Sequence, residues 1–408
     1  MGKEIYIINY GSNASDYGIG TYIREYIYCL KNIECQVNLI ELGINKADLT
    51  FSIKEEDGIR RIQIPFSFKD NLKTYSKGIC RLLRLYINDS PDLIFHFNYI
   101  NGDFYIFEIF KNYFPQSKMI LTIHYLCLGE RFLGNVSLFK RIIKNQNDKL
   151  TKERYQDVID NYTIEKKFIE NVDSVICLSK DTFQLVNEEY KIPKRKLHLI
   201  PNGLRNNCIK LSHKQRIKIR QRFSIKPDEK ILLFVGRVDV IKGIYPLLNC
   251  FEKIIREYPE CRIVIVGDGD IRGAIKNCTN VWPKVTFTGR LDQIKLYQWY
   301  QIADIALFPS FYEECSYVGI EMMMHGLPII ASDGYSVKNM FQEQFNAKIA
   351  RIENWKKFSK FEKNLTEAIL DALNSDLSKL KDEAKKVYEL TYNITNMQKK
   401  YKQLMDSL

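Results

Sequence analysis

The chain has 408 residues, a length that excludes a single small domain and predicts two or three, and 45% of its residues are hydrophobic, as in globular proteins. Lysine and arginine outnumber aspartate and glutamate by 61 to 49, which favours polyanions, phosphorylated ligands and anionic membrane surfaces as partners. The ten cysteines include no Cys-x-x-Cys pair and no zinc-ligand spacing with histidine, which predicts isolated thiols in a reducing cytoplasm.

The beginning of the chain has the pattern of a first strand. Charged Lys3 and Glu4 precede an apolar run that ends at Asn9, so the run is too short for the core of a signal peptide. No stretch approaches the roughly 18 apolar residues of a membrane-spanning helix. We therefore expect a cytoplasmic protein that is soluble, or peripheral at the inner face of the cell membrane.

Short apolar runs typical of buried strands alternate with helical patterns along the chain. In the first half the predicted strands are 5–8, 36–41, 93–97, 119–124 and 174–178, and a helix is predicted at 21–31. The alternation begins again with strands at 230–235, 262–266, 285–287, 305–308 and 328–331, and with a helix at 245–257. The near-continuous apolar strands predict an α/β fold with two doubly wound parallel sheets.

The boundary between the two halves is predicted near residues 191–222. This segment contains eleven basic residues and no acidic one, and it includes the turn-forming sequence Pro-Asn-Gly203. We expect a first domain over 1–200, a second over 201–385, and a C-terminal helix over 386–408 that packs back on the first domain.

The most specific motif lies between Pro309 and Pro328. Glu313 is predicted in the loop after a strand and Glu321 on the following helix, eight positions later. Ligands of parallel α/β sheets bind at this edge, where carboxylates accept hydrogen bonds from sugar hydroxyls and a helix N-terminus attracts anions. The alternative is a pair of solvated acids at a helix cap.

A second motif supplies cations at the same kind of edge. Arg237 and Lys242 lie in the predicted loop between a buried strand and a helix, with Gly236 and Gly243 beside them. An arginine fork and a lysine in such a loop bind a diphosphate, and the glycines allow close approach of the backbone. Taken singly, each cation also fits an ordinary surface position.

The first half contains weaker signals. Gly18 and Gly20 follow the first strand and open a helix, but Ile23 breaks the dinucleotide-binding fingerprint, so an anion-binding turn and a plain turn are equally compatible. His124 ends a predicted strand and is a functional candidate, with a buried structural histidine as the alternative. His96 is equally ambiguous.

Two further patterns have competing interpretations. Asp268 and Asp270 alternate with glycines, which fits a divalent-metal site, but we favour a turn. The basic segments 140–154 and 191–222 fit a solvated or membrane-facing surface better than a nucleic-acid site, because aromatic residues hardly interleave with the second one. The amphipathic stretch 138–144 fits a membrane-surface helix and a helix packed on its own domain equally well.

In their order along the chain, these motifs resemble the family-4 retaining glycosyltransferases, which have the two-domain GT-B fold. The resemblance covers nearly the whole chain. It is carried by Gly18-Ile-Gly-Thr-Tyr22, Thr-Ile-His124, residues 172–179, Ile-Pro-Asn-Gly203, Val-Gly-Arg237, Lys242-Gly243, Val-Gly-Asp-Gly269, Phe-Thr-Gly289, Ala303-Asp304 and the Glu-x7-Glu pair of Glu313 and Glu321. It implies two Rossmann-like domains that face each other across a cleft.

The resemblance also implies roles for the residues. Arg237 and Lys242 would hold the diphosphate of a nucleotide-sugar, Glu313 the sugar hydroxyls, and Glu321 the ribose diol. His124 would contact the sugar near the reacting carbon, and His124 and Glu313 would be the catalytic residues. The remaining donor-site residues would be Gly18, Gly20, Ser316, Tyr317 and Val318. No cofactor and no metal ion is expected.

The implied reaction transfers a hexose-type sugar, with retention of configuration, to a glycan or lipid-linked acceptor in surface polysaccharide or glycoconjugate biosynthesis. The partners are therefore a nucleotide-sugar and that acceptor, with peripheral contact to anionic membrane and no nucleic acid. The sequence departs from the family pattern at Glu314 and Ser316, where the family commonly has glycine. A nucleotide-sugar epimerase or phosphorylase of the same fold and an inactive basic binding module are the alternatives.

Overall fold

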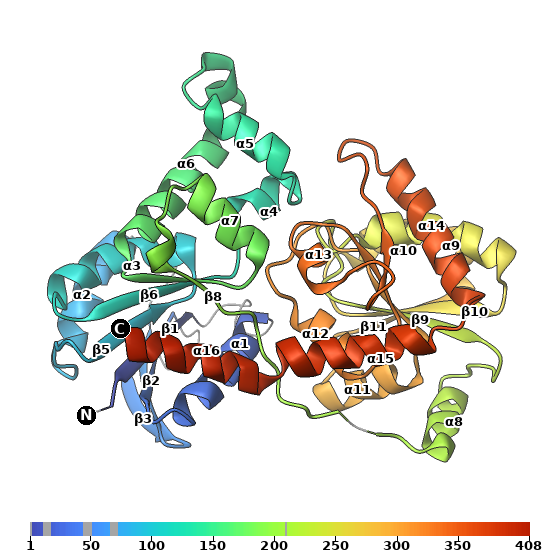
Figure 1. Cartoon of the computed structure of the whole chain (residues 1–408), viewed down its shortest axis with the longest axis horizontal. Helices are drawn as coiled ribbons and strands as arrows, with labels where there is room; N and C mark the ends of the chain where they lie inside the picture. Colours follow the sequence, from blue (N-terminus) through green and yellow to red (C-terminus); the bar gives the residue numbers. More distant parts are fainter. Residues whose placement is uncertain (1, 11–17, 44–50, 66–71, 209) are drawn as a thin grey trace. The chain divides into compact units, whose positions relative to one another are not determined.

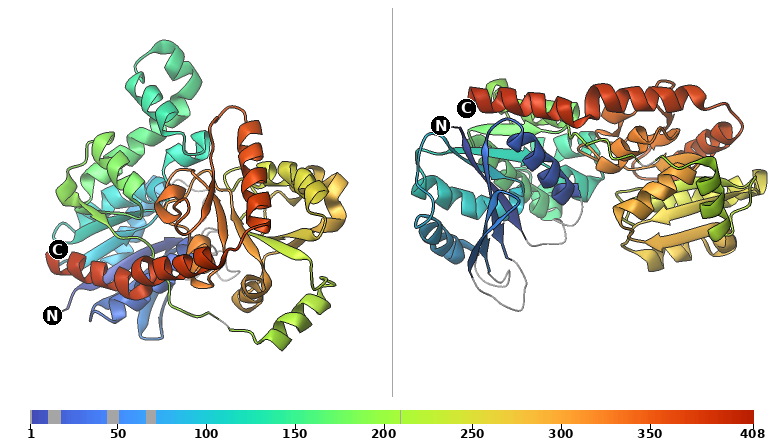
Figure 2. Two further views of the ribbon diagram at one scale, coloured as in Figure 1. Left: turned by 45° about the vertical axis from the view of Figure 1, so that its right-hand side comes forward. Right: turned by 90° about the horizontal axis from the view of Figure 1, so that it is seen from below.

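The computed structural model describes residues 2–10, 18–43, 51–65, 72–208 and 210–408, and it divides into two compact units (Figure 1). Unit 1 contains Met1–Cys127, Ser137–Gly203 and Ile394–Leu408, and unit 2 contains Leu128–Val136 and Leu204–Asn393. Each unit has its own sheet with helices on both faces (Figure 2).

Unit 1 is built on an eight-stranded sheet in the order β3-β4-β2-β1-β5-β6-β7-β8. All neighbouring strands are parallel except β3 and β4. The strands are β1 (Glu4–Tyr10), β2 (Gln36–Leu42), β3 (Ser52–Glu56), β4 (Ile59–Ile64), β5 (Leu93–Phe97), β6 (Lys118–Ile123), β7 (Ser174–Cys177) and β8 (Leu197–Leu199). The central strands are buried because their apolar side chains meet helices on both faces.

The helices of unit 1 follow the strands in chain order. They are α1 (Gly18–Lys31), α2 (Leu72–Leu83), α3 (Ile100–Tyr113), α6 (Lys149–Asn171), α7 (Lys180–Glu188) and α16 (Ile394–Ser407), while α4 (Cys127–Phe132) and α5 (Val136–Lys144) cross the boundaries between the units. Side chains of Asp148 and Ser179 cap the N-termini of α6 and α7. The C-terminal helix α16 packs against α1.

Unit 2 is built on a six-stranded parallel sheet in the order β11-β10-β9-β12-β13-β14. Its strands are β9 (Lys230–Val235), β10 (Cys261–Val266), β11 (Val285–Gly289), β12 (Ile305–Phe308), β13 (Ile329–Ser332) and β14 (Lys348–Ala350). Its helices are α8 (His213–Arg222), α9 (Ile244–Glu257), α10 (Ile271–Lys276), α11 (Gln293–Ile302), α12 (Tyr317–Met324), α13 (Val337–Met340), α14 (Ser359–Leu373) and α15 (Ser378–Val387). A continuous apolar core lies between β9, β10, β12 and the helices α9 and α14.

The prediction of two parallel-sheet Rossmann-like halves is confirmed. The predicted strands 93–97, 230–235 and 305–308 match β5, β9 and β12 in full, and the predicted strand 119–124 ends one residue earlier, so that His124 follows β6. The prediction missed β3, β4, β8 and β14.

The chain changes unit at places that differ from the predicted boundaries. Residues 386–393, which were predicted to pack on the first domain, belong to unit 2, and only the segment from Ile394 onward returns to unit 1. The reason is local hydrogen bonding: the Leu204 amide donates to the Tyr392 carbonyl at 2.9 Å, and the Tyr388 hydroxyl donates to the Leu204 carbonyl at 3.0 Å. The long segment of unit 2 begins at Leu204 rather than at residue 201, and the unit also includes the short segment Leu128–Val136.

Candidate functional site

Two loops at the carboxyl edge of the unit 2 sheet lie against each other. One follows β9 and contains Gly243, and the other follows β12 and contains Pro309. The Phe311 amide donates to the Ile241 carbonyl at 2.8 Å. Gly243 has a φ of +71°, and a Cβ at this position would lie 2.1 Å from the Pro309 carbonyl oxygen. Only glycine therefore permits this approach, which brings Lys242 to the second loop.

The approach of the loops unites two predicted site residues. The Lys242 ammonium lies 2.6 Å from a carboxylate oxygen of Glu313, and the Glu313 side chain is 9% exposed. The Lys242 amide donates to Asp239 at 3.0 Å, and the half-exposed Arg237 guanidinium pairs with the other oxygen of Asp239 at 2.9 Å. Both predicted cations and the first predicted carboxylate thus belong to one connected group.

Glu321 occupies a different environment on α12. Its carboxylate accepts a hydrogen bond from the Tyr300 hydroxyl at 2.9 Å. Burial raises the pKa of Glu321 to about 7, and hydrogen bonds from Tyr300 and Tyr297 oppose part of this rise. Sequence analysis missed both tyrosines, which α11 presents three positions apart and therefore on one helix face.

The predicted residues Ser316, Tyr317 and Val318 form the start of α12. Ser316 is the residue before the first helical turn, Tyr317 is buried, and Val318 is partly exposed. The amides of the first turn have no carbonyl partner within the helix, so they give this end a positive partial charge. The start of α12 belongs to the same strand-loop-helix passage as Glu313.

The family departure at Glu314 has a structural counterpart. Glu314 is buried, and the Tyr312 hydroxyl donates a hydrogen bond to its carboxylate. The Tyr312 ring stacks on Tyr335 at 5.0 Å with an interplanar angle of 4°. The Glu313 amide also donates to the Tyr335 carbonyl at 3.1 Å. These contacts fix the loop that carries both glutamates.

The preference for a turn at Asp268 and Asp270 agrees with the structure. The Asp270 side chain caps α10 by accepting from the Gly273 amide at 2.9 Å, and it also accepts from the Tyr245 hydroxyl at 2.5 Å. The Asp268 carbonyl accepts from the Val238 amide at 2.7 Å. Within the described ranges, no group of three or more His, Cys, Asp or Glu side chains is arranged to hold a metal ion.

In unit 1, His124 lies at the carboxyl end of β6. Its Nε2 is 3.2 Å from the Asn98 side-chain oxygen, and the Asn98 side-chain nitrogen donates to the Ile8 carbonyl at 3.3 Å. Because the amide nitrogen of Asn98 is committed to a carbonyl, its oxygen accepts from His124, so Nε2 carries the proton and Nδ1 is an acceptor. Burial lowers the pKa of His124 to about 3, which keeps the ring neutral.

A buried polar network lies below His124. The edge of the Tyr22 ring meets His124 with the ring centroids 4.5 Å apart. The Tyr22 hydroxyl is hydrogen-bonded to the Thr122 hydroxyl at 2.9 Å and to the Tyr401 hydroxyl of α16 at 2.5 Å. His96 is fully buried and lies 2.7 Å from the Thr122 hydroxyl, so it belongs to the support of the sheet edge rather than to its surface.

The two predicted glycines lie at the start of α1. Gly18 is exposed, with nothing within 4 Å of a Cβ built there, and Gly20 is buried. Tyr17 and residues 11–16 lie outside the described ranges. The anion-binding turn therefore stays a prediction.

The amphipathic stretch 138–144 forms most of α5. Its apolar side chains Phe139, Ile142 and Ile143 are buried, and the Phe139 ring lies 5.9 Å from that of Tyr162. The Lys140 ammonium pairs with Glu189 at 2.8 Å. Of the two interpretations, the structure favours a helix packed on its own domain. Among the described helices, none combines the length and apolar character needed to cross a bilayer.

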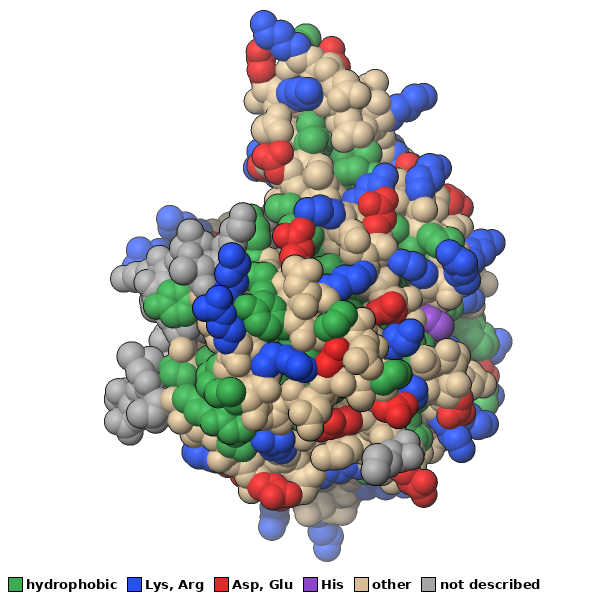
Figure 3. Space-filling view, turned by 90° about the vertical axis from the view of Figure 1, so that its left-hand side faces the viewer, with side chains coloured by type: hydrophobic (Ala, Val, Ile, Leu, Met, Phe, Trp, Pro, Cys, Tyr) green, Lys and Arg blue, Asp and Glu red, His purple; other side chains and the backbone are tan. Residues whose placement is uncertain are grey.

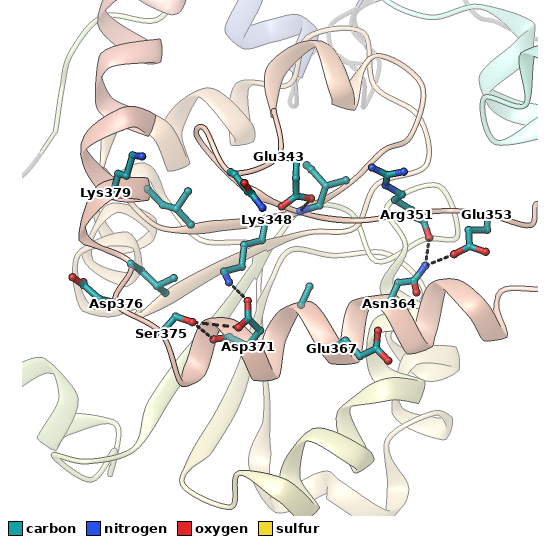
Figure 4. Close-up of a pocket in the computed structure, with 15 residues that line it drawn as sticks. Glu343, Lys348, Arg351, Glu353, Asn364, Glu367, Asp371, Ser375, Asp376 and Lys379 are labelled. Atoms are coloured by element: carbon teal, nitrogen blue, oxygen red, sulfur yellow. Dashed lines mark hydrogen bonds and ion pairs between the residues drawn. The ribbon is translucent and has the colours of Figure 1, made fainter.

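A groove of about 660 Å³ lies elsewhere on unit 2, between β14 and α14 (Figure 4). Among the side chains that line it, Lys348 pairs with Asp371, and the amide of Asn364 donates to Glu353 (Figure 4). None of the predicted site residues lines it.

Two family models match the chain. The Glycosyltransferase Family 4 model covers residues 17–205, and the Glycosyl transferases group 1 model covers residues 229–373. The chain therefore belongs to the glycosyltransferase family that these two models describe. The matches fall on the parts that carry the His124 network and the Lys242–Glu313 pair, respectively.

Curated relatives agree with this family. The chain is 31% identical over 177 residues to the uncharacterized glycosyltransferase MJ1607 of Methanocaldococcus jannaschii, over 42% of this chain and 45% of the relative. It is 26% identical over 184 residues to the alpha-monoglucosyldiacylglycerol synthase of Streptococcus pneumoniae, over 43% and 41% of the two chains. The matched segments therefore span less than half of these relatives.

Solved glycosyltransferase structures share the fold over almost the whole chain. Sucrose-phosphate synthase from Thermosynechococcus elongatus superimposes with a TM-score of 0.76 at 20% identity, covering 99% of this chain and 98% of the other. HepE from Anabaena, solved in complex with UDP and glucose, gives a TM-score of 0.72 at 13% identity and covers both chains fully. The protein therefore has the GT-B fold.

Proposed function

We propose that this glycosyltransferase moves a hexose-type sugar from a nucleoside diphosphate sugar to a glycan or lipid-linked acceptor, with retention of configuration, in surface polysaccharide or glycoconjugate biosynthesis. The observation that carries the proposal is the Lys242–Glu313 pair with Arg237 beside it, at the carboxyl edge of a parallel sheet. Cations for a diphosphate and a carboxylate for hydroxyls are the groups that such a donor requires.

The proposed donor site uses the ion pair as a preformed anchor. The donor diphosphate forms ion pairs with Lys242 and Arg237. The Glu313 carboxylate is then free to accept hydrogen bonds from sugar hydroxyls. The ionised Glu321 carboxylate accepts hydrogen bonds from the ribose diol. Amides at the start of α12 add positive partial charge.

The proposed chemistry relies on electrostatic stabilisation of the leaving group. The bond between the anomeric carbon and the diphosphate breaks, and the acceptor oxygen bonds to the same face of that carbon. The acceptor proton passes to the departing phosphate oxygen. Lys242 and Arg237 stabilise the charge that develops on the diphosphate, and neutral His124 contacts the sugar near the reacting carbon. We propose that the reaction proceeds without a metal ion.

The comparisons support the partners of this proposal. The HepE structure contains UDP and glucose, which favours a nucleotide-sugar donor. The name of the pneumococcal relative specifies a glucosylated diacylglycerol, which favours a lipid-linked acceptor. We propose a cytoplasmic enzyme that contacts the inner face of an anionic membrane peripherally and binds no nucleic acid.

Donor binding and transfer across a panel of uridine, guanosine and adenosine diphosphate sugars test the proposal. One donor should be consumed, with release of the nucleoside diphosphate and a longer acceptor, and chelator should have no effect. Glu321→Ala and Lys242→Ala should abolish transfer while the circular dichroism spectrum is unchanged. Full activity of both variants, or products without a longer acceptor, would refute the proposal.

A further inference from the structure

Helix α8 presents an unusual run of positive charge on unit 2. Residues 204–227 of this unit contain eight lysines and arginines and no acidic residue. On α8 the exposed side chains Lys214, Lys218 and Arg222 repeat every four positions, so they form a stripe along one face. None of the three forms an ion pair with another described residue.

The opposite side of α8 packs on the domain. The Arg216 guanidinium donates to the Gln301 side chain at 3.1 Å, and Arg220 donates to the Ile302 carbonyl at 3.1 Å. At about 100° per residue, Lys214 and Lys218 lie 120° or more from these two arginines around the helix. The stripe therefore points away from α11, and α8 lies at the periphery of its unit (Figure 1).

The stripe conflicts with what stabilises an isolated helix. Like charges at spacing i, i+4 repel, and a lysine in the first turn opposes the helix dipole, while no acidic residue of α8 offsets either effect. On the face shown in Figure 3, by contrast, basic and acidic side chains are interspersed. A stripe of one sign that local interactions do not explain is expected where an external partner supplies the opposite charge.

We propose that the outer face of α8 docks on an anionic phospholipid surface. The stripe is straight and exposed, as electrostatic adsorption to lipid headgroups requires. Ile217, which is 40% exposed, lies about 60° around the helix from both Lys214 and Arg220, so it borders the stripe on the flank between the exposed side and the packed side. Single-stranded nucleic acid is less favoured because Phe223, the aromatic residue at the end of α8, packs against the Trp299 ring with the centroids 4.6 Å apart, and none of the stripe residues is aromatic.

This proposal adds a defined surface to the peripheral contact in the proposed function, and it rests on that function only for the reason to approach a membrane. Vesicle binding is measured without donor or acceptor. A failure of the docking surface is therefore distinguishable from a failure of the glycosyltransferase proposal.

The experiment compares the full chain with two triple variants of equal charge. The test variant is Lys214→Gln, Lys218→Gln and Arg222→Gln. The control variant neutralises the exposed lysines Lys253, Lys276 and Lys357 on other surfaces of unit 2. Co-sedimentation uses vesicles of phosphatidylglycerol mixed with phosphatidylcholine and vesicles of phosphatidylcholine alone, at low and at physiological salt, with circular dichroism to check folding.

Each basic residue near a charged surface strengthens partitioning about fivefold, so the test variant should bind the anionic vesicles about 100-fold more weakly than the unmodified chain. The control variant should retain most of the binding to anionic vesicles. Vesicles of pure phosphatidylcholine should bind none of the three proteins. Equal losses in both variants, equal binding to both vesicle types, or a stripe that binds single-stranded RNA but no vesicles would overturn the proposal.

Discussion

Replacement of Glu321 by glutamine should stabilise unit 2 while it weakens donor binding. The carboxyl group has a pKa of about 7 in the folded protein, against an ordinary value of 4.5, because burial disfavours its charge. Well below pH 4.5 the group is protonated in both the folded and the unfolded chain, so it does not lower the free energy of unfolding. As the pH rises from 4.5 to 7, the Glu321 carboxyl ionises in the unfolded chain before it does so in the folded chain. The free energy of unfolding therefore falls.

The size of the effect follows from the shift. A difference of about 2.5 pH units corresponds to about 3 kcal/mol at 1.36 kcal/mol per unit, and this full penalty applies above pH 7. Glutamine carries no charge but still accepts the hydrogen bond from Tyr300. The variant should therefore gain up to about 3 kcal/mol at pH 8 and about 1 kcal/mol at pH 5.

Thermal unfolding followed by tryptophan fluorescence measures this difference. The three tryptophans, Trp282, Trp299 and Trp355, all lie in unit 2, so the signal reports the unfolding of that unit. The gap in Tm between variant and unmodified chain should be roughly 5–8 °C wider at pH 8 than at pH 5. The exposed Glu367→Gln serves as control. A gap that does not widen with pH would refute the burial argument.

Three other predictions concern the neighbouring residues. Lys242→Ala should weaken donor binding at least tenfold, measured by calorimetry, because the diphosphate loses a charged partner; unchanged affinity would remove Lys242 from the donor site. Gly243→Ala should disrupt the loops and also reduce donor binding, since its Cβ would meet the Pro309 carbonyl oxygen at 2.1 Å; a normal affinity would contradict the close approach. Asn98→Asp should raise the pKa of His124 from about 3 towards neutrality, visible in an NMR titration, because the new carboxylate favours the imidazolium; a pKa that does not move would contradict the hydrogen bond.

The sequence predicted the strands best where one apolar run is buried on both faces. β5, β9 and β12 are such runs, so the prediction located both of their ends. β3 was missed because Ser52–Glu56 is exposed and largely polar and therefore shows no apolar period. The Asp57-Gly58 dipeptide that follows it was a usable signal, since both residues have positive φ in the turn to β4.

The sequence predicted those residues of the candidate site that lie in short motifs, but it did not predict which of them contact each other. Lys242 and Glu313 were each placed at a sheet edge, but their 2.6 Å contact joins residues 71 positions apart. Asn98 and Tyr401 were not singled out, and Tyr22 appeared only as the end of a motif, because their roles come from tertiary contacts, the longest between residues separated by 379 positions. Sequence patterns identify the edge of a sheet, and long-range packing decides which side chains meet there.

The buried Glu229 and the partly exposed Glu321 lie toward opposite ends of the unit 2 strands and have different partners. Burial alone would raise the pKa of Glu229, but ion pairs with Arg262 at 3.1 Å and Lys284 at 3.3 Å hold it below its ordinary value. Among the described residues, the partners of the Glu321 carboxylate are tyrosine hydroxyls and not a cation, and the pKa of Glu321 is raised. A carboxyl group without a cationic partner is one that a ligand can satisfy, and this physical difference is why we propose Glu321, and not Glu229, for the donor site.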